Sequence, residues 1–315
     1  MGYPSVDRRR VLAAAALGRE AGVPGPEPES GAPLHAVAGE ILDVSPHLII
    51  IENEDGREER LVIAPWATAW RGIDVAPADL PVGGRVIMRA LHDGRVVERI
   101  WADITRATGA IVSIEGRQDL TIELDCGSHR GHRTIVIPYR TTGRLRVRHP
   151  SLEPGFLFDG IGVRNGVETR VVLPATSQPA YLARNVPAPP PAYAGQQARI
   201  SGTATWADAF DEGERGAAYP MLERSDTGCP DAEVSCVRLP YLALGSLLQV
   251  KNLCTDRSAG VSVVACGCLA GRFCDRCVEC GTSPRGRIVE LSPLSFVELG
   301  GDLTKGCFNA QIGLG

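Results

Sequence analysis

Ten cysteines carry the most concentrated chemistry of this 315-residue chain, and nine of them lie in its last third. Five fall within fifteen residues, with the spacing C-x-C-x5-C-x-x-C-x-x-C. Such density is typical either of an exported domain held by disulfides or of a thiolate metal site. The disulfide candidates are Cys229, Cys236, Cys254, Cys266, Cys268, Cys274, Cys277, Cys280 and Cys307. The alternative is a zinc site built from Cys266, Cys268, Cys274, Cys277 and Cys280.

Short strand patterns surround these cysteines in a recognisable order. They are GTATW at 202–206, LPYLALGSLLQVKNL at 239–253, VSVV at 261–264 and GRIVELSPLSF at 286–296. This order resembles the double-psi β-barrel of the rare lipoprotein A and expansin families, over roughly residues 197–315. Proteins of those families act on peptidoglycan or cellulose outside the cytoplasm. The resemblance therefore implies a cell-wall glycan as the partner.

The same resemblance indicates which carboxylates could act on a glycan. Of the two acids that the families place near the groove, the first aligns with Ala265 and the second with Glu290. Alanine neither donates nor accepts a proton, so the one remaining acid favours binding without turnover. The alternative is a lytic transglycosylase-like enzyme in which Glu290 serves first as acid and then as base. Ser292 and Pro293 follow as a helix cap and first helical residue, so Glu290 could also be a structural carboxylate.

Aromatic and acidic residues near the opening strand are the candidate sugar contacts. Trp206 and Tyr241 have flat faces that could stack on pyranose rings, or could pack in the barrel core. Asp208 follows two residues after Trp206 and is the third substrate-binding candidate. Other acids of this region could replace the missing groove acid or simply be solvated: Asp211, Glu212 and Glu223.

Neighbouring residues favour disulfides over zinc. No histidine lies in the last third of the chain, so a zinc site there would need thiolates alone. Expansin barrels carry several disulfides, which is what the resemblance implies here. Cys229 and Cys236 bracket a six-residue loop and are predicted to form a local bridge. Because nine is odd, one thiol stays unpaired, pairs with Cys126 or bonds another molecule; no other cofactor is predicted.

Export is predicted from the first forty residues. Residues 7–12 (DRRRVL) fit a twin-arginine pattern, and Ala36-Val37-Ala38 forms an A-x-A motif that predicts cleavage before Gly39. We expect an extracellular or cell-envelope location on this basis. The apolar run stops at Arg19, so a disordered cytoplasmic N-terminus is the alternative. No stretch reaches eighteen apolar residues, and no membrane span is predicted.

An internal repeat organises the N-terminal half. Residues 39–44 recur at 109–114, 48–53 at 120–125 and 61–65 at 134–138, at offsets of 70 to 73 residues. Each unit contains about five strand patterns, with a D-G or N-G turn before the last. This pattern favours two small barrels similar to OB-like domains.

Net charge and charge clustering indicate less about function than the cysteines and the strand motifs do. The net charge of −4 and the pI of about 5.9 argue against a nucleic-acid-binding protein. One local basic cluster, whose alternation predicts one solvated face of a strand, consists of Arg140, Arg144, Arg146 and Arg148.

Taken together, these patterns predict an all-β protein: two tandem OB-like small barrels followed by a disulfide-rich double-psi β-barrel. The expected parts are a signal or disordered segment 1–38, repeats 39–105 and 106–178, a proline-rich linker 179–197 and the last barrel 198–315. Because prolines cannot enter a sheet interior, the two halves are expected to fold independently. The predicted function is binding or loosening of a cell-wall polysaccharide. The alternatives are a transglycosylase-like enzyme and a zinc-knot protein-interaction module.

Overall fold

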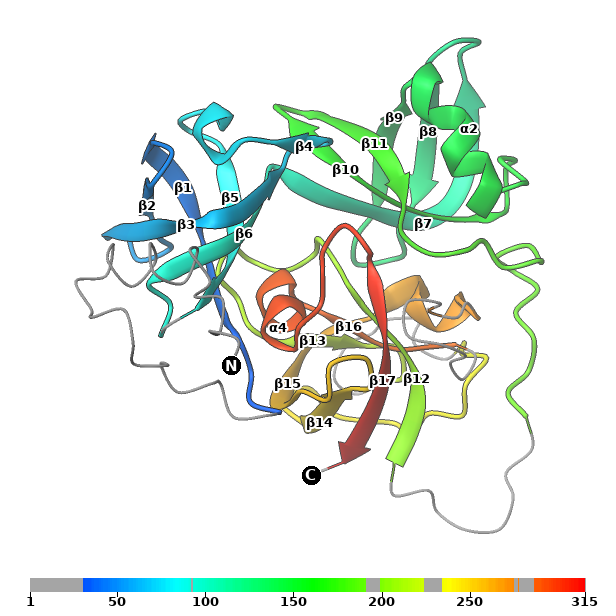
Figure 1. Cartoon of the computed structure of the whole chain (residues 1–315). Helices are drawn as coiled ribbons and strands as arrows, with labels where there is room; N and C mark the ends of the chain where they lie inside the picture. The colour runs from blue at the N-terminus through cyan, green and yellow to red at the C-terminus, as the bar shows by residue number, and fades with distance from the viewer. Residues whose placement is uncertain are drawn as a thin grey trace, which may run out of the picture.

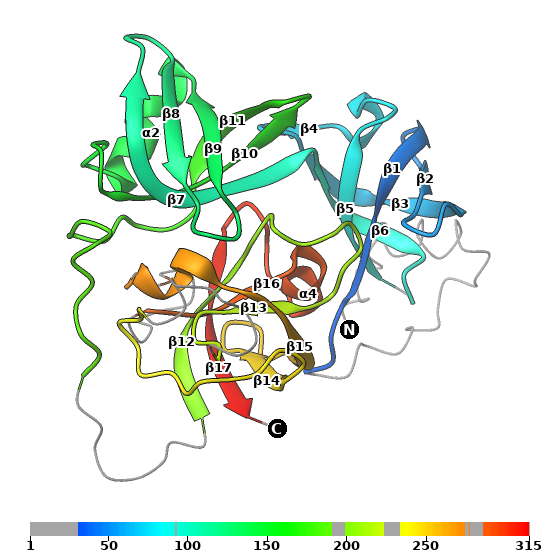
Figure 2. The ribbon, with the colours of Figure 1, turned by 180° about the vertical axis from the view of Figure 1, so that it is seen from behind.

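The computed structural model describes residues 31–91, 93–190, 199–223, 234–274, 277 and 286–314. In these residues the regular structure is mainly β and forms three small barrels. The first two barrels lie side by side, and the third, coloured yellow-green to red, packs beneath both of them (Figures 1 and 2). The predicted all-β class, with two tandem OB-like barrels ahead of a third, is confirmed. None of the described helices is long and apolar enough to cross a membrane.

The first two barrels repeat one connectivity. The first is a sheet of order β2-β1-β5-β6-β3-β4 closed by β2–β3 pairing, and the second is a closed barrel of order β10-β11-β9-β8-β7. The elements of the first are β1 (His35–Val44), β2 (Leu48–Glu52), β3 (Glu58–Trp70), β4 (Asp74–Val75), η1 (Pro77–Asp79), β5 (Arg85–Leu91) and β6 (Val96–Ala102). Those of the second are β7 (Ile104–Glu115), β8 (Leu120–Asp125), β9 (His132–Ile137), α2 (Tyr139–Arg148), β10 (Leu157–Asn165) and β11 (Glu168–Pro174). In each barrel the third and fifth main strands pair in parallel.

A glycine and a bulge explain why the sequence repeat is so regular at the start of each barrel. A Cβ on Gly39 would lie 2.4 Å from the carbonyl oxygen of Glu52, and one on Gly109 would lie 2.6 Å from that of Asp125. Three residues after each glycine the strand carries a β-bulge, at the same offset of 70 residues. Bulges bend and twist a strand, so both barrels curve at the equivalent point.

The basic cluster lies on a helix, and the prediction of a strand for it is wrong. Residues 139–148 form α2, which fills the place that β4 and η1 occupy in the first barrel. Two local contacts begin the helix: the Tyr139 N–H donates to Asp119 at 2.9 Å, and the Thr141 hydroxyl donates to the Pro138 carbonyl at 2.8 Å. Only Leu145 of the helix is buried, so the usual apolar helix period is missing from the sequence.

A single residue, Asp103, separates β6 from β7 and joins the first two barrels. Its backbone φ is +50°, which lies in the left-handed region that Asp tolerates better than most residues. The carboxylate pairs with Arg71 at 2.7 Å and accepts the Arg85 N–H at 3.1 Å. Its carbonyl accepts the N–H of Arg164 at 2.8 Å. The joint is therefore bonded to both barrels.

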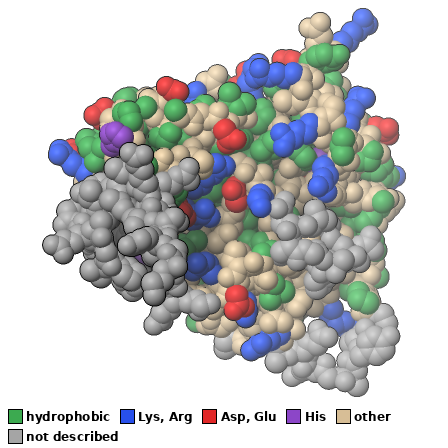
Figure 3. All heavy atoms as spheres, in the orientation of Figure 1, with side chains coloured by type: hydrophobic (Ala, Val, Ile, Leu, Met, Phe, Trp, Pro, Cys, Tyr) green, Lys and Arg blue, Asp and Glu red, His purple; other side chains and the backbone are tan. Residues whose placement is uncertain are grey.

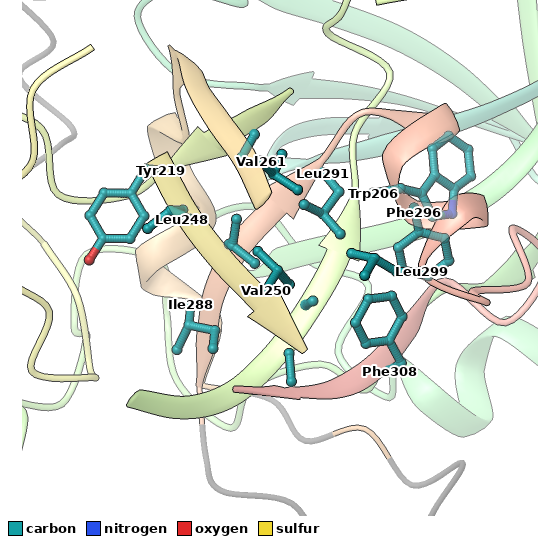
Figure 4. Close-up of a cluster of buried hydrophobic side chains, with 14 of the residues drawn as sticks. Trp206, Tyr219, Leu248, Val250, Val261, Ile288, Leu291, Phe296, Leu299 and Phe308 are labelled. Carbon is teal, nitrogen blue, oxygen red and sulfur yellow. The ribbon is translucent and has the colours of Figure 1, made fainter. Parts of the chain in front are cut away.

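The third barrel has the strand order β12-β16-β13-β15-β14-β17, with β12–β16 and β13–β15 pairing in parallel. Its elements are β12 (Arg199–Trp206), β13 (Ala217–Tyr219), β14 (Leu247–Asn252), β15 (Ser258–Cys266), η3 (Cys268–Arg272), β16 (Arg287–Leu291), α4 (Pro293–Glu298) and β17 (Cys307–Leu314). Buried aliphatic and aromatic side chains fill its interior, among them Val250, Ile288 and Phe308 (Figure 4). The predicted cap is confirmed, since the Ser292 side chain accepts the Ser295 N–H and Pro293 begins α4.

One apolar cluster extends across all three barrels, in addition to the separate cores inside the first and second barrels. The largest buried cluster joins Trp70 and Trp101 of the first barrel and Ile161 and Leu173 of the second to the interior of the third. The Trp101 indole N–H also donates to Asp302 of the third barrel at 3.3 Å. Separating the halves would expose the side chains of the shared cluster to water, whereas the first two barrels also have buried cores of their own. Independent folding of the halves stays a prediction.

The start of β1 reaches the third barrel and bears on the expected cleavage site. In Figure 1 this strand runs down from the first barrel toward α4 and β14. The Leu34 N–H donates to the Glu298 carbonyl at 2.7 Å, and Arg215 donates to the Ala36 carbonyl at 3.1 Å. Cleavage before Gly39 would remove these contacts and the pairing of residues 35–38 with β5. The A-x-A motif thus lies inside a structural strand.

We expect a chain that begins at Gly39 to be less stable than one that begins at Gly31. Several backbone hydrogen bonds are lost, at roughly 1 kcal/mol each, so the free energy of unfolding should fall by about 2–4 kcal/mol. Urea unfolding of the two forms measures this difference. Equal midpoints would show that residues 31–38 add nothing to the fold.

Candidate functional site

The two positions that the resemblance assigns to groove acids lie in one row of the third barrel. Ala218 of β13 is the register partner of both Ala265 on β15 and Glu290 on β16. Directly opposed residues project to the same face of a sheet, and two strand spacings separate the outer pair by roughly 10 Å. Two of the three side chains in the row are methyl groups, so Glu290 is its only carboxylate.

Glu290 is fully buried between two guanidinium groups. One carboxylate oxygen lies 3.2 Å from Arg287 Nη1, and the other lies 2.8 Å from Arg130 Nη2. Arg130 comes from the β8–β9 loop of the second barrel and also approaches the Cys266 carbonyl, at 3.4 Å. It therefore contacts both β15 and β16. Burial opposes the charge of Arg130, but the neighbouring Glu290 carboxylate outweighs that effect and raises its pKa.

A second buried carboxylate, Asp159 on β10, continues this charge network between the second and third barrels. Arg106 binds it through two contacts of 2.8 and 2.7 Å, and Arg287 lies 2.7 Å from Oδ2. The Thr176 hydroxyl donates to the same oxygen at 2.8 Å. Burial disfavours the charge of Asp159, yet the two arginines prevail and hold its pKa far below the usual range. These ion pairs hold the second barrel against β16 of the third barrel.

Trp206 and Tyr241 are not placed together. Trp206 is fully buried, its indole N–H donates to the Leu303 carbonyl at 3.0 Å, and the Arg106 guanidinium lies over its ring. Tyr241 is half exposed, and the carbonyl of its neighbour Pro240 accepts the Tyr219 hydroxyl at 3.2 Å. Figure 4 shows Tyr219 on the opposite side of the buried cluster from Trp206. In this arrangement Trp206 packs between barrels and cannot stack on a sugar.

Asp208 lies at the junction of the barrels instead of in a groove. Its carboxylate is 2.8 Å from Arg164 and 3.3 Å from Arg133, and it accepts the Thr105 hydroxyl at 2.5 Å. All three partners belong to the second barrel. Of the other acids in this region, Glu212 pairs with Arg85 of the first barrel at 3.3 Å. Asp208 and Glu212 therefore link the third barrel to the second and first barrels, respectively.

The structure pairs Cys236 with Cys274, with an S–S distance of 1.98 Å. The predicted bridge between Cys229 and Cys236 is wrong, because Cys236 has a different partner. Cys254 and Cys266 are disulfide-bonded as well. Buried positions are found for Cys268, Cys277 and Cys307, whereas Cys229 and Cys280 lie outside the described residues. A sulfur in a disulfide is not a thiolate ligand, so the proposed zinc set loses Cys266 and Cys274.

Sequence reasoning missed the partners of Glu290. Arg130 lies 160 residues earlier in the chain, in a turn between two glycines, and no local pattern links it to β16. Asp159 and Arg106 sit on strands of the second repeat and look like ordinary polar positions in the sequence. Only the docking of one barrel on the other brings these groups together.

The arrangement can hold two barrels together but does not offer Glu290 to a substrate. A general acid must present a proton to the leaving oxygen of the glycan. Here both carboxylate oxygens of Glu290 face arginines, and no part of its side chain reaches solvent. No family model matches the chain, and comparison with curated proteins gives no match either. The similarity to rare lipoprotein A and expansins thus remains a resemblance of short motifs.

Proposed function

We propose that this protein binds a cell-envelope polysaccharide without cleaving it, and that it acts outside the cytoplasm. The observation that carries the absence of turnover is the buried state of Glu290 in a row whose other members are Ala218 and Ala265. The glycan partner is supported by the motif resemblance. The export proposal is supported by the twin-arginine pattern and by the disulfide of Cys236 with Cys274.

Retention on insoluble wall polymers tests the proposal. The protein is incubated with purified peptidoglycan sacculi and, separately, with microcrystalline cellulose, and both the bound protein and the released soluble sugar are measured. We expect retention on at least one polymer and no release of anhydro-muropeptides or soluble glucan. If neither polymer retains the protein, glycan binding is wrong.

Glu290→Gln separates binding from acid catalysis. The substitution keeps the size of the side chain and removes its titratable proton, so a binding protein should show the same retention and the same lack of release. Release by the natural protein that disappears in Glu290→Gln would instead support the transglycosylase-like alternative. Because Glu290 is buried in ion pairs, thermal unfolding is measured alongside to confirm that the variant is folded.

A further inference from the structure

An open cleft of about 420 Å³ lies where α2 faces the third barrel, and Thr176 is the one member of the buried charge network that lines it. Helix α2 supplies one wall, the chain just after β11 supplies the floor, and the segment before β17 supplies the other wall. A volume of this size is within the range of small-molecule and oligosaccharide sites. Glu290 is absent from its lining, so this cleft is a separate candidate for ligand binding.

The side chains that line the cleft carry positive charge and no negative charge. Arg144 and Arg148 project from α2, and Lys305 lies on the opposite wall. Arg144 and Arg148 are one helical turn apart, about 6 Å along the axis. The Arg148 guanidinium donates to the Ser177 hydroxyl at 3.1 Å, so two lining side chains are bonded to each other. No aspartate or glutamate lines the cleft among the described residues.

The arginines of α2 stand apart from acidic side chains. Several other arginines of the described surface lie beside acids, as in the pairs Arg60–Glu58, Arg71–Asp103, Arg89–Glu98 and Arg215–Glu298. For the four arginines of α2 the described part of the chain offers no acidic partner. In Figure 3 blue side chains gather over the second barrel and along its border with the third. Rows of like charge at four-residue spacing destabilise a helix, so a bound anion would relieve this repulsion.

We propose that this cleft binds the carboxylate groups of an acidic polysaccharide, an inference that rests on the proposed function and names its ligand class. Arginine binds a carboxylate through two parallel N–H···O bonds, which suits Arg144 and Arg148 at a one-turn spacing. The rest of the lining matches a sugar ring: Ser177 and Thr304 offer hydroxyls, and the exposed Val147 offers an apolar surface. The chain as a whole has a net charge of −4, so the protein is not expected to attract polyanions over its entire surface. Binding of an acidic polymer should therefore depend on the local cations of this cleft.

The test compares two double variants of α2 that change the net charge equally. Arg144→Gln with Arg148→Gln removes the cations that line the cleft, and Arg140→Gln with Arg146→Gln removes two that do not line it. All four side chains are exposed, so both variants are expected to fold. Binding to soluble polygalacturonate is measured by calorimetry, with neutral dextran, polyphosphate and single-stranded DNA as comparison polymers.

We expect the natural protein to bind polygalacturonate and not dextran, and the first double variant to bind roughly tenfold or more weakly because charge-assisted bonds are lost. The second double variant should keep most of the affinity. Equal loss in both variants, or no binding by the natural protein, would overturn the cleft as the site. Equal or tighter binding of polyphosphate or DNA would overturn the carboxylate assignment. Retention on sacculi or cellulose is scored separately, so failure here leaves the proposed function standing.

Discussion

Replacing Asp159 by Asn is expected to cost about 3–5 kcal/mol of unfolding free energy, because it leaves two buried arginines with too little negative charge. Arg106 and Arg287 both contact this carboxylate and are themselves almost entirely buried. Urea unfolding at neutral pH measures the loss. If the variant does not fold, Thr176→Val is a milder test, since it removes one hydrogen bond to Asp159 and should cost about 1–2 kcal/mol.

A matched control is Glu58→Gln, which makes the same chemical change in an exposed ion pair. Glu58 lies 2.8 Å from Arg60, yet the side chains are 48% and 69% exposed, so the expected loss is below about 1 kcal/mol. An Asp159→Asn variant as stable as the control would mean that the network adds little to the docking of the second barrel.

The stabilising effect of Asp159 should also depend on pH in a defined direction. Its pKa lies far below the value near 4 of an unfolded aspartate, so the unfolded chain binds the proton first. The stabilisation is therefore fully present above about pH 4 and declines as the pH falls below that value. The difference between the natural protein and Asp159→Asn should shrink over the same acidic range.

Loss of the Cys236–Cys274 disulfide is expected to destabilise the third barrel by about 4 kcal/mol, the chain-entropy value for a loop of this length. The two cysteines are 38 residues apart in sequence, so the bond restricts a long loop in the unfolded chain. The double substitution Cys236→Ser and Cys274→Ser is compared with the natural protein by thermal unfolding without reductant. A reductant should lower the melting temperature of the natural protein to that of the variant or further.

Cys126→Ala is the control for this comparison. Cys126 is a buried thiol of the second barrel outside any disulfide, and burial raises its pKa. The control should keep the full response to reductant. A double Ser variant with an unchanged melting temperature would contradict a stabilising role for the bond and would weaken the case for an exported protein.

The barrels could be predicted from sequence because their determinants are local. Gly39 and Gly109 begin matching patterns 70 residues apart, and both mark a close strand approach followed by a bulge. Ser292 and Pro293 identified the start of α4 in the same way. Helix α2 was missed because only Leu145 is buried, so alternating arginines suggested a strand.

The site could be predicted only in part, because its chemistry depends on docking between barrels. The motif resemblance pointed to Glu290, which does lie in one row with Ala265. Its burial under Arg130 has no sequence signature, since a turn arginine becomes a partner only when the second barrel packs on the third. Disulfide connectivity is equally non-local, as the actual partner of Cys236 shows.

The one-residue joint at Asp103 limits how the molecule can move. Domains connected by long flexible linkers reorient freely, whereas here the joint is bonded to both barrels and both barrels rest on the third. The three barrels should therefore keep one fixed arrangement in solution scattering, and the distances between them should not change with ionic strength. A ligand held at α2 would then keep a constant distance and orientation relative to the first barrel. A polymer bound there would contact a rigid surface, and the barrels would not close around it by a hinge motion.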